Sequence, residues 1–212
     1  MSYRPFAIVA AATSILMLPS AATAQDRTYV AGSLGYTFAD DFETDVGVEA
    51  SLKKGYAVTG AVGRSFGPLR GEIEGSYRRS KVDEARGLGA VVQGDGDVTA
   101  LSAMANVYFD PAFQFGPVKP YVGGGIGLSR FRARDVEAVG VPGLSPVSGK
   151  ETGFAWQLMA GAGLALSEQA TLTAGYRYFA TPDVKANVAP LGSVKVDGLG
   201  LHAFEVGLRF SL

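Results

Sequence analysis

The chain has 212 residues, a net charge of −1 and no cysteine, and 47% of its residues are hydrophobic against 18% charged. This composition is too apolar for a disordered chain, and it excludes disulfides and metal–thiolate sites. The near-neutral charge lacks the excess of basic residues that is typical of a nucleic-acid-binding protein. The length favours one domain.

The N-terminal residues have the pattern of a cleavable signal peptide. Arg4 precedes an apolar run over residues 6–18, and the triplet ending at Ala24 fits the small-x-small rule for cleavage. A transmembrane helix is the alternative, but the run is shorter than the roughly 20 residues that cross a bilayer. We therefore predict a signal peptide at 1–24 and one domain at 25–212.

In eight later segments, large apolar residues alternate with small or charged ones. A period of two residues is that of a β-strand with one apolar face. The closing segment, "HAFEVGLRFSL", has Phe204, Val206 and Leu208 on one face and Glu205 and Arg209 on the other. In chain order, the expected strands are 28–38, 56–66, 69–82, 98–110, 118–132, 152–166, 170–181 and 202–212.

The connections between these strands alternate in length. Gly67-Pro68, residues 111–117 and residues 167–169 form short links. The long connections are 39–55, 83–97, 133–151 and 182–197. Short turns at one end and long loops at the other predict an all-β fold, an eight-stranded antiparallel up-and-down barrel.

Alternation alone leaves open whether the apolar face of the strands meets a ligand inside a soluble barrel or lipid outside a membrane barrel. An eight-stranded interior is just wide enough for side chains to fill, which suits the small-residue phase. Charged residues on that phase would cost roughly 2–4 kcal/mol per cation if they faced the bilayer midplane, whereas inside they can pair. We therefore expect a transmembrane barrel with a polar network in its lumen, formed by Arg70, Glu72, Glu74, Arg78, Arg177, Glu205 and Arg209.

Aromatic residues occupy the same alternate positions as the large apolar residues, mostly toward the ends of the expected strands. Amphipathic rings favour the two membrane–water interfaces. The residues expected at these interfaces are Tyr36, Tyr56, Trp156, Tyr176, Tyr178 and Phe210.

Three stretches resemble the eight-stranded outer-membrane β-barrel (porin) family, which includes the OmpA-type transmembrane domain and the Omp25-like and rickettsial-type surface antigens. They are "RGEIEGSYRR" (70–79), "KPYVGGGIGLS" (119–129) and "FAWQLMAGAGLALSEQATLTAGYRYF" (154–179). The resemblance implies the outer membrane of a Gram-negative bacterium, with short turns toward the periplasm and four long extracellular loops. Members of the family usually end in an aromatic residue that the barrel-assembly machinery reads. Here Leu212 is last and Phe210 lies two positions earlier on the same face.

Chemical motifs give little support to an enzyme. His202 is the only histidine of the chain. The outer-membrane lipid A deacylases resemble a His-x-Ser arrangement, whereas here Phe204 occupies the position of the serine. The glycines over 123–127 fail the dinucleotide-binding pattern and suit close packing of the interior. The spacing of the acidic residues in the long connections does not match a calcium loop; these are Asp40, Asp41, Glu43, Asp45, Asp95 and Asp97. We expect no catalytic residue, no cofactor and no metal.

The leading hypothesis is an integral outer-membrane protein with a structural and surface-interaction role and a filled lumen. The alternative is a narrow porin-like channel for ions or small solutes, in which the Arg/Glu set acts as a gate. A lipid enzyme that uses His202 is the third hypothesis. The expected partners are outer-membrane lipid or lipopolysaccharide and the assembly machinery, with no nucleic acid. The protein is expected to be a monomer, and the loop partners are left open.

Overall fold

The computed structural model describes residues 27–39, 42–43, 49–87, 90–93, 97–113, 115–136, 147–182, 184–188, 192–196 and 200–212. The predicted signal peptide and its cleavage site lie outside these residues. No helix among the described residues is long and apolar enough to cross a membrane.

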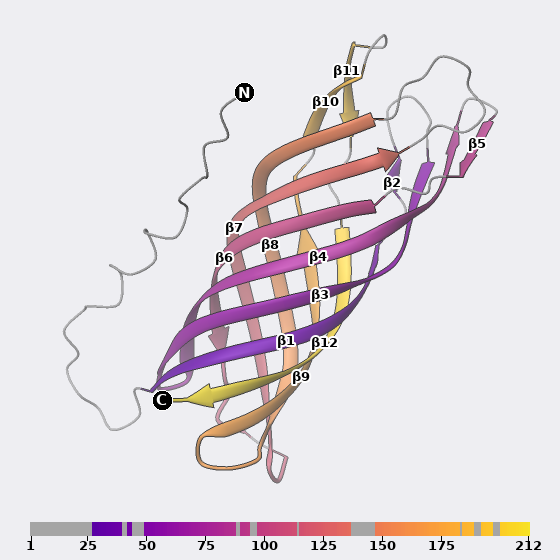
Figure 1. Cartoon of the computed structure of the whole chain (residues 1–212). Helices are drawn as coiled ribbons and strands as arrows, with labels where there is room; N and C mark the ends of the chain where they lie inside the picture. Colours follow the sequence, from indigo (N-terminus) through magenta and orange to yellow (C-terminus); the bar gives the residue numbers. More distant parts are fainter. Residues whose placement is uncertain are drawn as a thin grey trace, which may run out of the picture.

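Strands make up the regular structure of the described residues (Figure 1). They are β1 (Thr28–Ala39), β2 (Phe42–Glu43), β3 (Glu49–Phe66), β4 (Leu69–Gly87), β5 (Ala90–Gln93), β6 (Asp97–Phe109), β7 (Val118–Val136), β8 (Val147–Ala165), β9 (Ala170–Ala180), β10 (Val184–Val188), β11 (Gly192–Val196) and β12 (Gly200–Ser211).

Eight of these strands form one closed antiparallel wall, in the order β1, β3, β4, β6, β7, β8, β9 and β12. The wall closes where β1 pairs with β12, with Leu34 opposite Val206. Closure leaves the wall without an edge strand, so its backbone groups are paired within the barrel. The predicted eight-stranded up-and-down barrel is confirmed.

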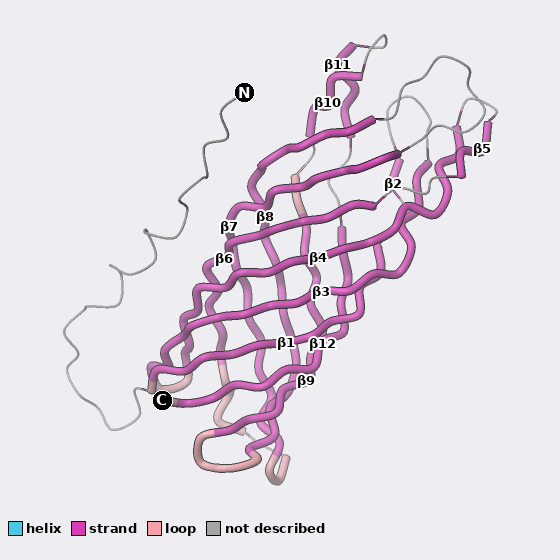
Figure 2. Tube along the Cα trace, in the orientation of Figure 1, coloured by secondary structure: helices cyan, strands magenta, loops and turns pink. Residues whose placement is uncertain are grey.

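The two ends of the barrel differ. At the end we call the turn end, Gly67-Pro68 joins β3 to β4, residues 166–169 join β8 to β9, and the chain finishes beside the start of β1 (Figure 2). Gly67 has φ 63°, a left-handed conformation that glycine adopts without steric cost. The opposite end, which we call the hairpin end, carries β2, β5 and the β10–β11 pair (Figure 1).

The expectation that the long connections are loops is wrong in part, because strand pairing continues well beyond the alternating segments. β3 begins at Glu49 rather than residue 56, β4 runs to Gly87, and β8 begins at Val147. Alternation of apolar residues marks a strand only where one of its faces meets an apolar environment. Hydrogen-bonded ladders extend past that region without the pattern, as at Glu49 and Ala50, which pair with Arg86 and Ala85.

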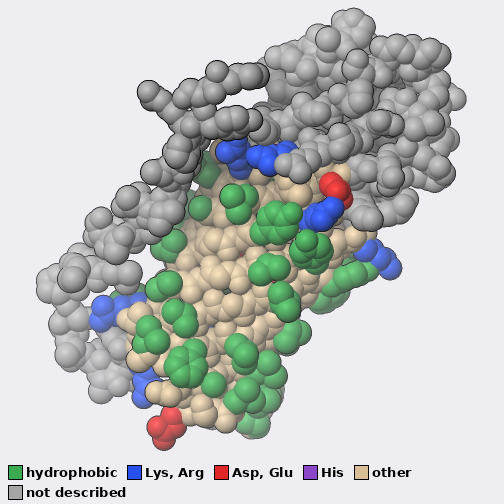
Figure 3. All heavy atoms as spheres, viewed as in Figure 1, with side chains coloured by type: hydrophobic (Ala, Val, Ile, Leu, Met, Phe, Trp, Pro, Cys, Tyr) green, Lys and Arg blue, Asp and Glu red, His purple; other side chains and the backbone are tan. Residues whose placement is uncertain are grey.

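Exposure alternates along β6 and gives the orientation of the wall. On β6, Leu101 is 61% exposed and Val107 is 60% exposed, while Ser102 and Asn106 are 4% and 2% exposed. Figure 3 shows the outward apolar side chains as a band around the visible face of the barrel. The large apolar residues therefore point away from the barrel axis and the polar residues point into it.

Candidate functional site: the interior polar network

Arg177 on β9 forms the centre of the interior network. Its Nη1 donates to both carboxylate oxygens of Glu74 at 2.9 Å. Its Nε and Nη2 donate to Glu205 at 2.8 and 3.0 Å. Glu74 lies on β4, which is separated from β9 by three strands in either direction around the wall. The ion pair between Arg177 and Glu74 therefore crosses the full width of the barrel.

Two buried amides join this bridge to other parts of the wall. Asn106 on β6 donates from Nδ2 to Glu74 at 3.0 Å, and Gln157 on β8 donates from Nε2 to Asn106 Oδ1 at 2.7 Å. Gln157 also lies 3.4 Å from Glu74 Oε1 as a donor. Each carboxylate oxygen of Glu74 thus accepts from an arginine and an amide, as a buried charge requires.

Arg78 is held by neutral partners rather than by a carboxylate. Its Nη1 donates to Ser76 at 2.7 Å and to Ser102 at 3.3 Å, and its Nη2 lies 3.5 Å from Gln157 Oε1. Its guanidinium carbon lies 4.1 Å from the centre of the Phe179 ring. The cation is therefore stabilised by hydroxyl and amide dipoles and by a cation–π contact.

A second ionic cluster closes the turn end of the lumen. Arg70 binds Asp110 through two hydrogen bonds of 2.7 and 3.0 Å, and its Nη1 lies 3.3 Å from Glu72. Tyr29 donates its hydroxyl hydrogen to Glu72 at 2.7 Å. The Arg70 guanidinium also lies 4.4 Å from the centre of the Tyr108 ring. Side chains from β1, β4, β6 and the following turn therefore meet across this end.

Arg209 lies beside this second cluster. Its guanidinium carbon is 5.4 Å from the centre of the Tyr29 ring, on which Arg70 also sits at 5.9 Å. Tyr121 on β7 contacts Tyr108 edge to face, with ring centres 5.8 Å apart. Aromatic rings and cations alternate through this layer, which is a favourable arrangement at short range.

An apolar layer occupies the lumen toward the hairpin end. Met104, Ala155, Phe179 and Leu201 are each at most 5% exposed and form one cluster, against which Phe131 packs. These residues point inward although bulky side chains were expected on the outward phase. The space for them comes from small neighbours such as Ala155, so the interior is filled by a mixture of large and small side chains.

Glycines on the inner face of β7 make room for the bulky residues of β6. A Cβ atom on Gly125 would collide with Asn106 Oδ1 and would lie 2.9 Å from the carbonyl oxygen of Ala105. A Cβ atom on Gly123 would collide with the ring of Tyr108. The glycine run therefore permits close packing of the interior.

The structure places the seven predicted network residues on the inner face and separates them into two groups. Glu74, Arg177 and Glu205 are joined in the central bridge, and Arg70 and Glu72 meet at the turn end. Arg78 and Arg209 face aromatic rings instead. The expected set omitted Tyr29, Asn106, Asp110 and Gln157, all of which could have been found because they fall on the inner phase of the expected strands.

The predicted interface aromatics lie on the outward phase of their strands. Tyr36, Tyr56, Trp156, Tyr176 and Tyr178 lie toward the hairpin end, and Phe210, 46% exposed, lies at the turn end. The wall therefore carries aromatic side chains near both limits of its apolar band.

His202 belongs to the aromatic group at the hairpin end. Its ring stacks on Phe38 with centres 5.2 Å apart and lies 5.0 Å from Tyr178. Its Nδ1 forms a hydrogen bond with the Tyr176 hydroxyl. These neighbours are aromatic and outward-facing, which suits a polar residue at a membrane interface.

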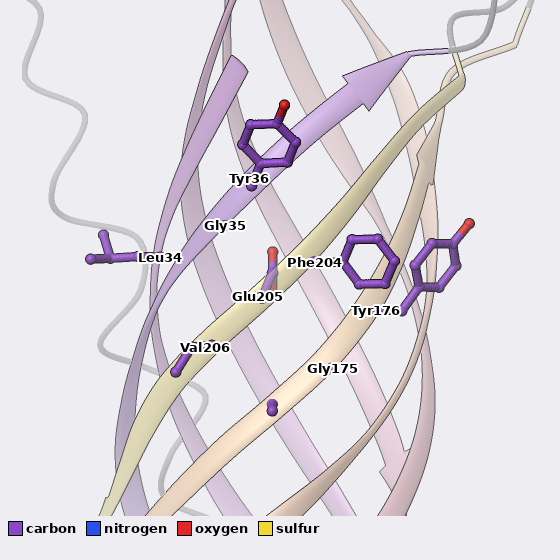
Figure 4. A pocket seen from close by; sticks show the side chains of 9 residues that line it. Leu34, Gly35, Tyr36, Gly175, Tyr176, Phe204, Glu205 and Val206 are labelled. Atoms are coloured by element: carbon purple, nitrogen blue, oxygen red, sulfur yellow. The ribbon is translucent and has the colours of Figure 1, made fainter. Parts of the chain in front are cut away.

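A groove of about 710 Å³ runs along the outer wall over β1, β12 and β9 (Figure 4). Leu34, Tyr36, Ala174, Phe204 and Val206 are among the residues that line it. Figure 4 shows Leu34 and Tyr36 projecting away from the barrel. The apolar lining of this groove suits an acyl chain better than a polar substrate.

Among the residues that the structure describes, no three His, Asp or Glu side chains cluster closely enough to hold a metal ion. Asp97 instead binds Arg79. Asp40, Asp41, Asp45 and Asp95 and the side chain of Glu43 lie outside the described residues.

Solved structures with the same fold include two outer-membrane proteins. Neisserial surface protein A is 21% identical, with a TM-score of 0.58 over 87% of this chain and 97% of that chain. OprG from Pseudomonas aeruginosa is 16% identical, with a TM-score of 0.55 over 89% of this chain and 97% of that chain. A comparison with curated protein sequences gives no match.

The profile of one protein family, described as the outer membrane protein beta-barrel domain, matches residues 7–208. The chain belongs to this family. The family resemblance drawn from the three sequence stretches is therefore confirmed, and so is the location in the outer membrane of a Gram-negative bacterium. The alternative of a soluble ligand-binding barrel is wrong, and the outward apolar band of this outer-membrane barrel faces lipid.

Proposed function

We propose that this outer-membrane barrel has a structural and surface-interaction role and does not conduct solutes. The observation that carries the proposal is the ion pair from Arg177 to Glu74, which joins opposite walls of the lumen. A solute that follows the barrel axis would have to break this pair. Both side chains are at most 5% exposed, so separating them would leave two buried charges without their counter-ions, which is unfavourable.

Three consecutive layers support a closed lumen. The cluster around Arg70 and Asp110 fills the turn end, the Arg177 bridge fills the middle, and Phe179 and Leu201 fill the hairpin end. The layers differ in chemistry, so one change of charge or pH does not release all three. This arrangement supports a plug over a gate.

A non-catalytic role agrees with the surroundings of His202. His202 lies on the outer face of the wall among the rings of Phe38, Tyr176 and Tyr178, which is the setting of a residue at the membrane interface. We propose that it anchors the barrel at the interface.

The partners that fit this proposal are membrane lipid and the barrel-assembly machinery. At the turn end of β12, Phe210 and Leu212 lie two residues apart and are both exposed. We propose that the assembly machinery recognises this outward apolar pair. A monomer suffices, since the wall is closed by its own strands.

Planar-bilayer recording tests the closed lumen. We expect the folded wild-type protein to give no stable unit conductance. The double variant Glu74→Ala/Arg177→Ala should also remain silent, because the layers around Arg70 and Phe179 still fill the two ends. Heat-modifiable gel mobility of the same proteoliposomes confirms that folded barrels are present.

The channel hypothesis makes the opposite prediction for the same recording. A reproducible wild-type unit conductance that changes in Arg177→Ala or Glu74→Ala would show that solutes pass the bridge, and would end the structural proposal. Arg79→Ala serves as the matched control, because it removes one arginine from the outer wall and leaves the lumen unchanged.

A further inference from the structure

Arginines gather on the outer wall just beyond the apolar band, at the hairpin end of β4, β6 and β7. Thr99 on β6 pairs with Arg79 on one side and Arg132 on the other, and Leu101 pairs with Arg130. The three arginines therefore occupy two neighbouring rows of one continuous sheet. Figure 3 shows Lys and Arg side chains along this edge, where the apolar side chains end.

The position of these arginines places them at the depth of lipid head groups. Ile126 and Leu128 on β7 are both 60% exposed on the lipid side, and Arg130 follows on the same face and is exposed. Tyr77 precedes Arg79 in the same way on β4. A cation that continues the lipid-facing phase one step past the last apolar residue lies where hydrocarbon gives way to charged head groups.

The register brings further basic positions near these arginines. Lys150 pairs with Arg132, and Asp97 pairs with both Lys81 and Arg134. We call the three arginines whose side chains the structure describes the basic sector: Arg79, Arg130 and Arg132. Together with Asp97 they give a local excess of two positive charges, in a chain whose total charge is −1.

The one acidic residue of these rows is already bound. Asp97 accepts from Arg79 Nε at 3.2 Å and from Nη2 at 2.5 Å. Arg130 is exposed and Arg132 is half-buried in the rows beside this pair. Two parallel N–H donors of a guanidinium match a phosphate group in geometry and charge.

We propose that the basic sector binds a phosphomonoester-bearing lipid of the outer leaflet. The acyl chains of that lipid would lie against Ile126, Leu128 and Leu101, and its phosphate against Arg130 and Arg132. The opposite side of the barrel carries aromatic residues at the same level, with Phe38 and His202 in contact. Phosphate binding at the basic sector does not depend on whether the lumen conducts.

Trp156 provides the measurement, because it is the only tryptophan of the chain and pairs with Ile126 beneath the basic sector. The full barrel is reconstituted in bilayers of phosphatidylcholine with either brominated phosphatidic acid or brominated phosphatidylcholine. Quenching of Trp156 by each gives the relative binding constant of the phosphomonoester lipid. We expect a constant well above 1 that falls with added salt.

Arg130→Gln/Arg132→Gln should lower this constant by roughly fivefold for each arginine replaced. The control is Arg27→Gln/Lys119→Gln, which removes the same charge from exposed positions at the turn end and should leave the constant unchanged. A wild-type constant of 1, or an equal fall in both double variants, would overturn the proposal. Heat-modifiable mobility of each variant shows that it is folded.

Discussion

Replacing Arg177 by alanine is expected to lower the free energy of unfolding by about 3–5 kcal/mol. The substitution leaves the carboxylates of Glu74 and Glu205 facing each other without their shared cation, in a lumen where Glu74 is 2% exposed. Urea unfolding of the barrel in lipid vesicles, followed by Trp156 fluorescence, measures the loss.

Two further variants separate the loss of charge balance from the loss of packing. Arg177→Met/Glu74→Gln/Glu205→Gln removes all three charges at similar volume and should recover most of the stability, because no uncompensated charge remains buried. Arg79→Gln breaks an ion pair whose arginine side chain is 42% exposed, and it should cost at most about 1 kcal/mol. If Arg177→Ala were no more destabilising than Arg79→Gln, the central bridge would have no energetic role.

Gly125→Ala is expected to destabilise the barrel by about 3 kcal/mol. The added methyl group would collide with Asn106 Oδ1, which accepts from Gln157, and it would crowd the backbone of Ala105. Overpacking costs about 1–3 kcal/mol, and the displaced amide leaves buried polar groups unpaired at a similar cost. The same unfolding experiment measures this change.

The neighbouring glycine offers a control in the same strand. A Cβ atom on Gly124 would point outward and meet Leu158 at 3.5 Å, which is ordinary van der Waals contact. Gly124→Ala should therefore leave stability unchanged or raise it by about 0.5 kcal/mol, since alanine has less conformational freedom to lose. Equal losses at Gly124 and Gly125 would show that the inner face of β7 is not tightly packed.

Much of the fold could be predicted because the lipid and the lumen impose opposite demands on alternate residues. Leu101 and Ser102 differ in exposure as their chemistry indicates, and the same rule places Glu205 inside and Val206 outside. The alternation also predicted the number of strands in the wall. It could not predict how far β3, β4 and β8 extend, since beyond the bilayer neither face has to be apolar.

Membership of the interior network was predictable, but its partners were not. The period of each strand places Arg177 and Glu74 in the lumen, whereas their contact depends on β4 and β9 lying opposite each other in the closed wall. Asp110 is the last residue of the expected strand 98–110 and falls on its inner phase, but it was not included in the expected network. Phe179 was missed because bulky residues were expected to face lipid, and Leu201 was missed because it precedes the expected strand 202–212.

Nitroxide accessibility along β6 tests the orientation of the wall most directly. The chain has no native cysteine, so single cysteines from Leu101 to Phe109 can be labelled one at a time in lipid bilayers. Collision with oxygen, which concentrates in the hydrocarbon, should peak at Leu101, Val107 and Phe109 and fall at Ser102 and Asn106. Peaks at Ser102 and Asn106 instead, or no period of two, would contradict a barrel whose apolar face meets lipid and whose charged network fills its lumen.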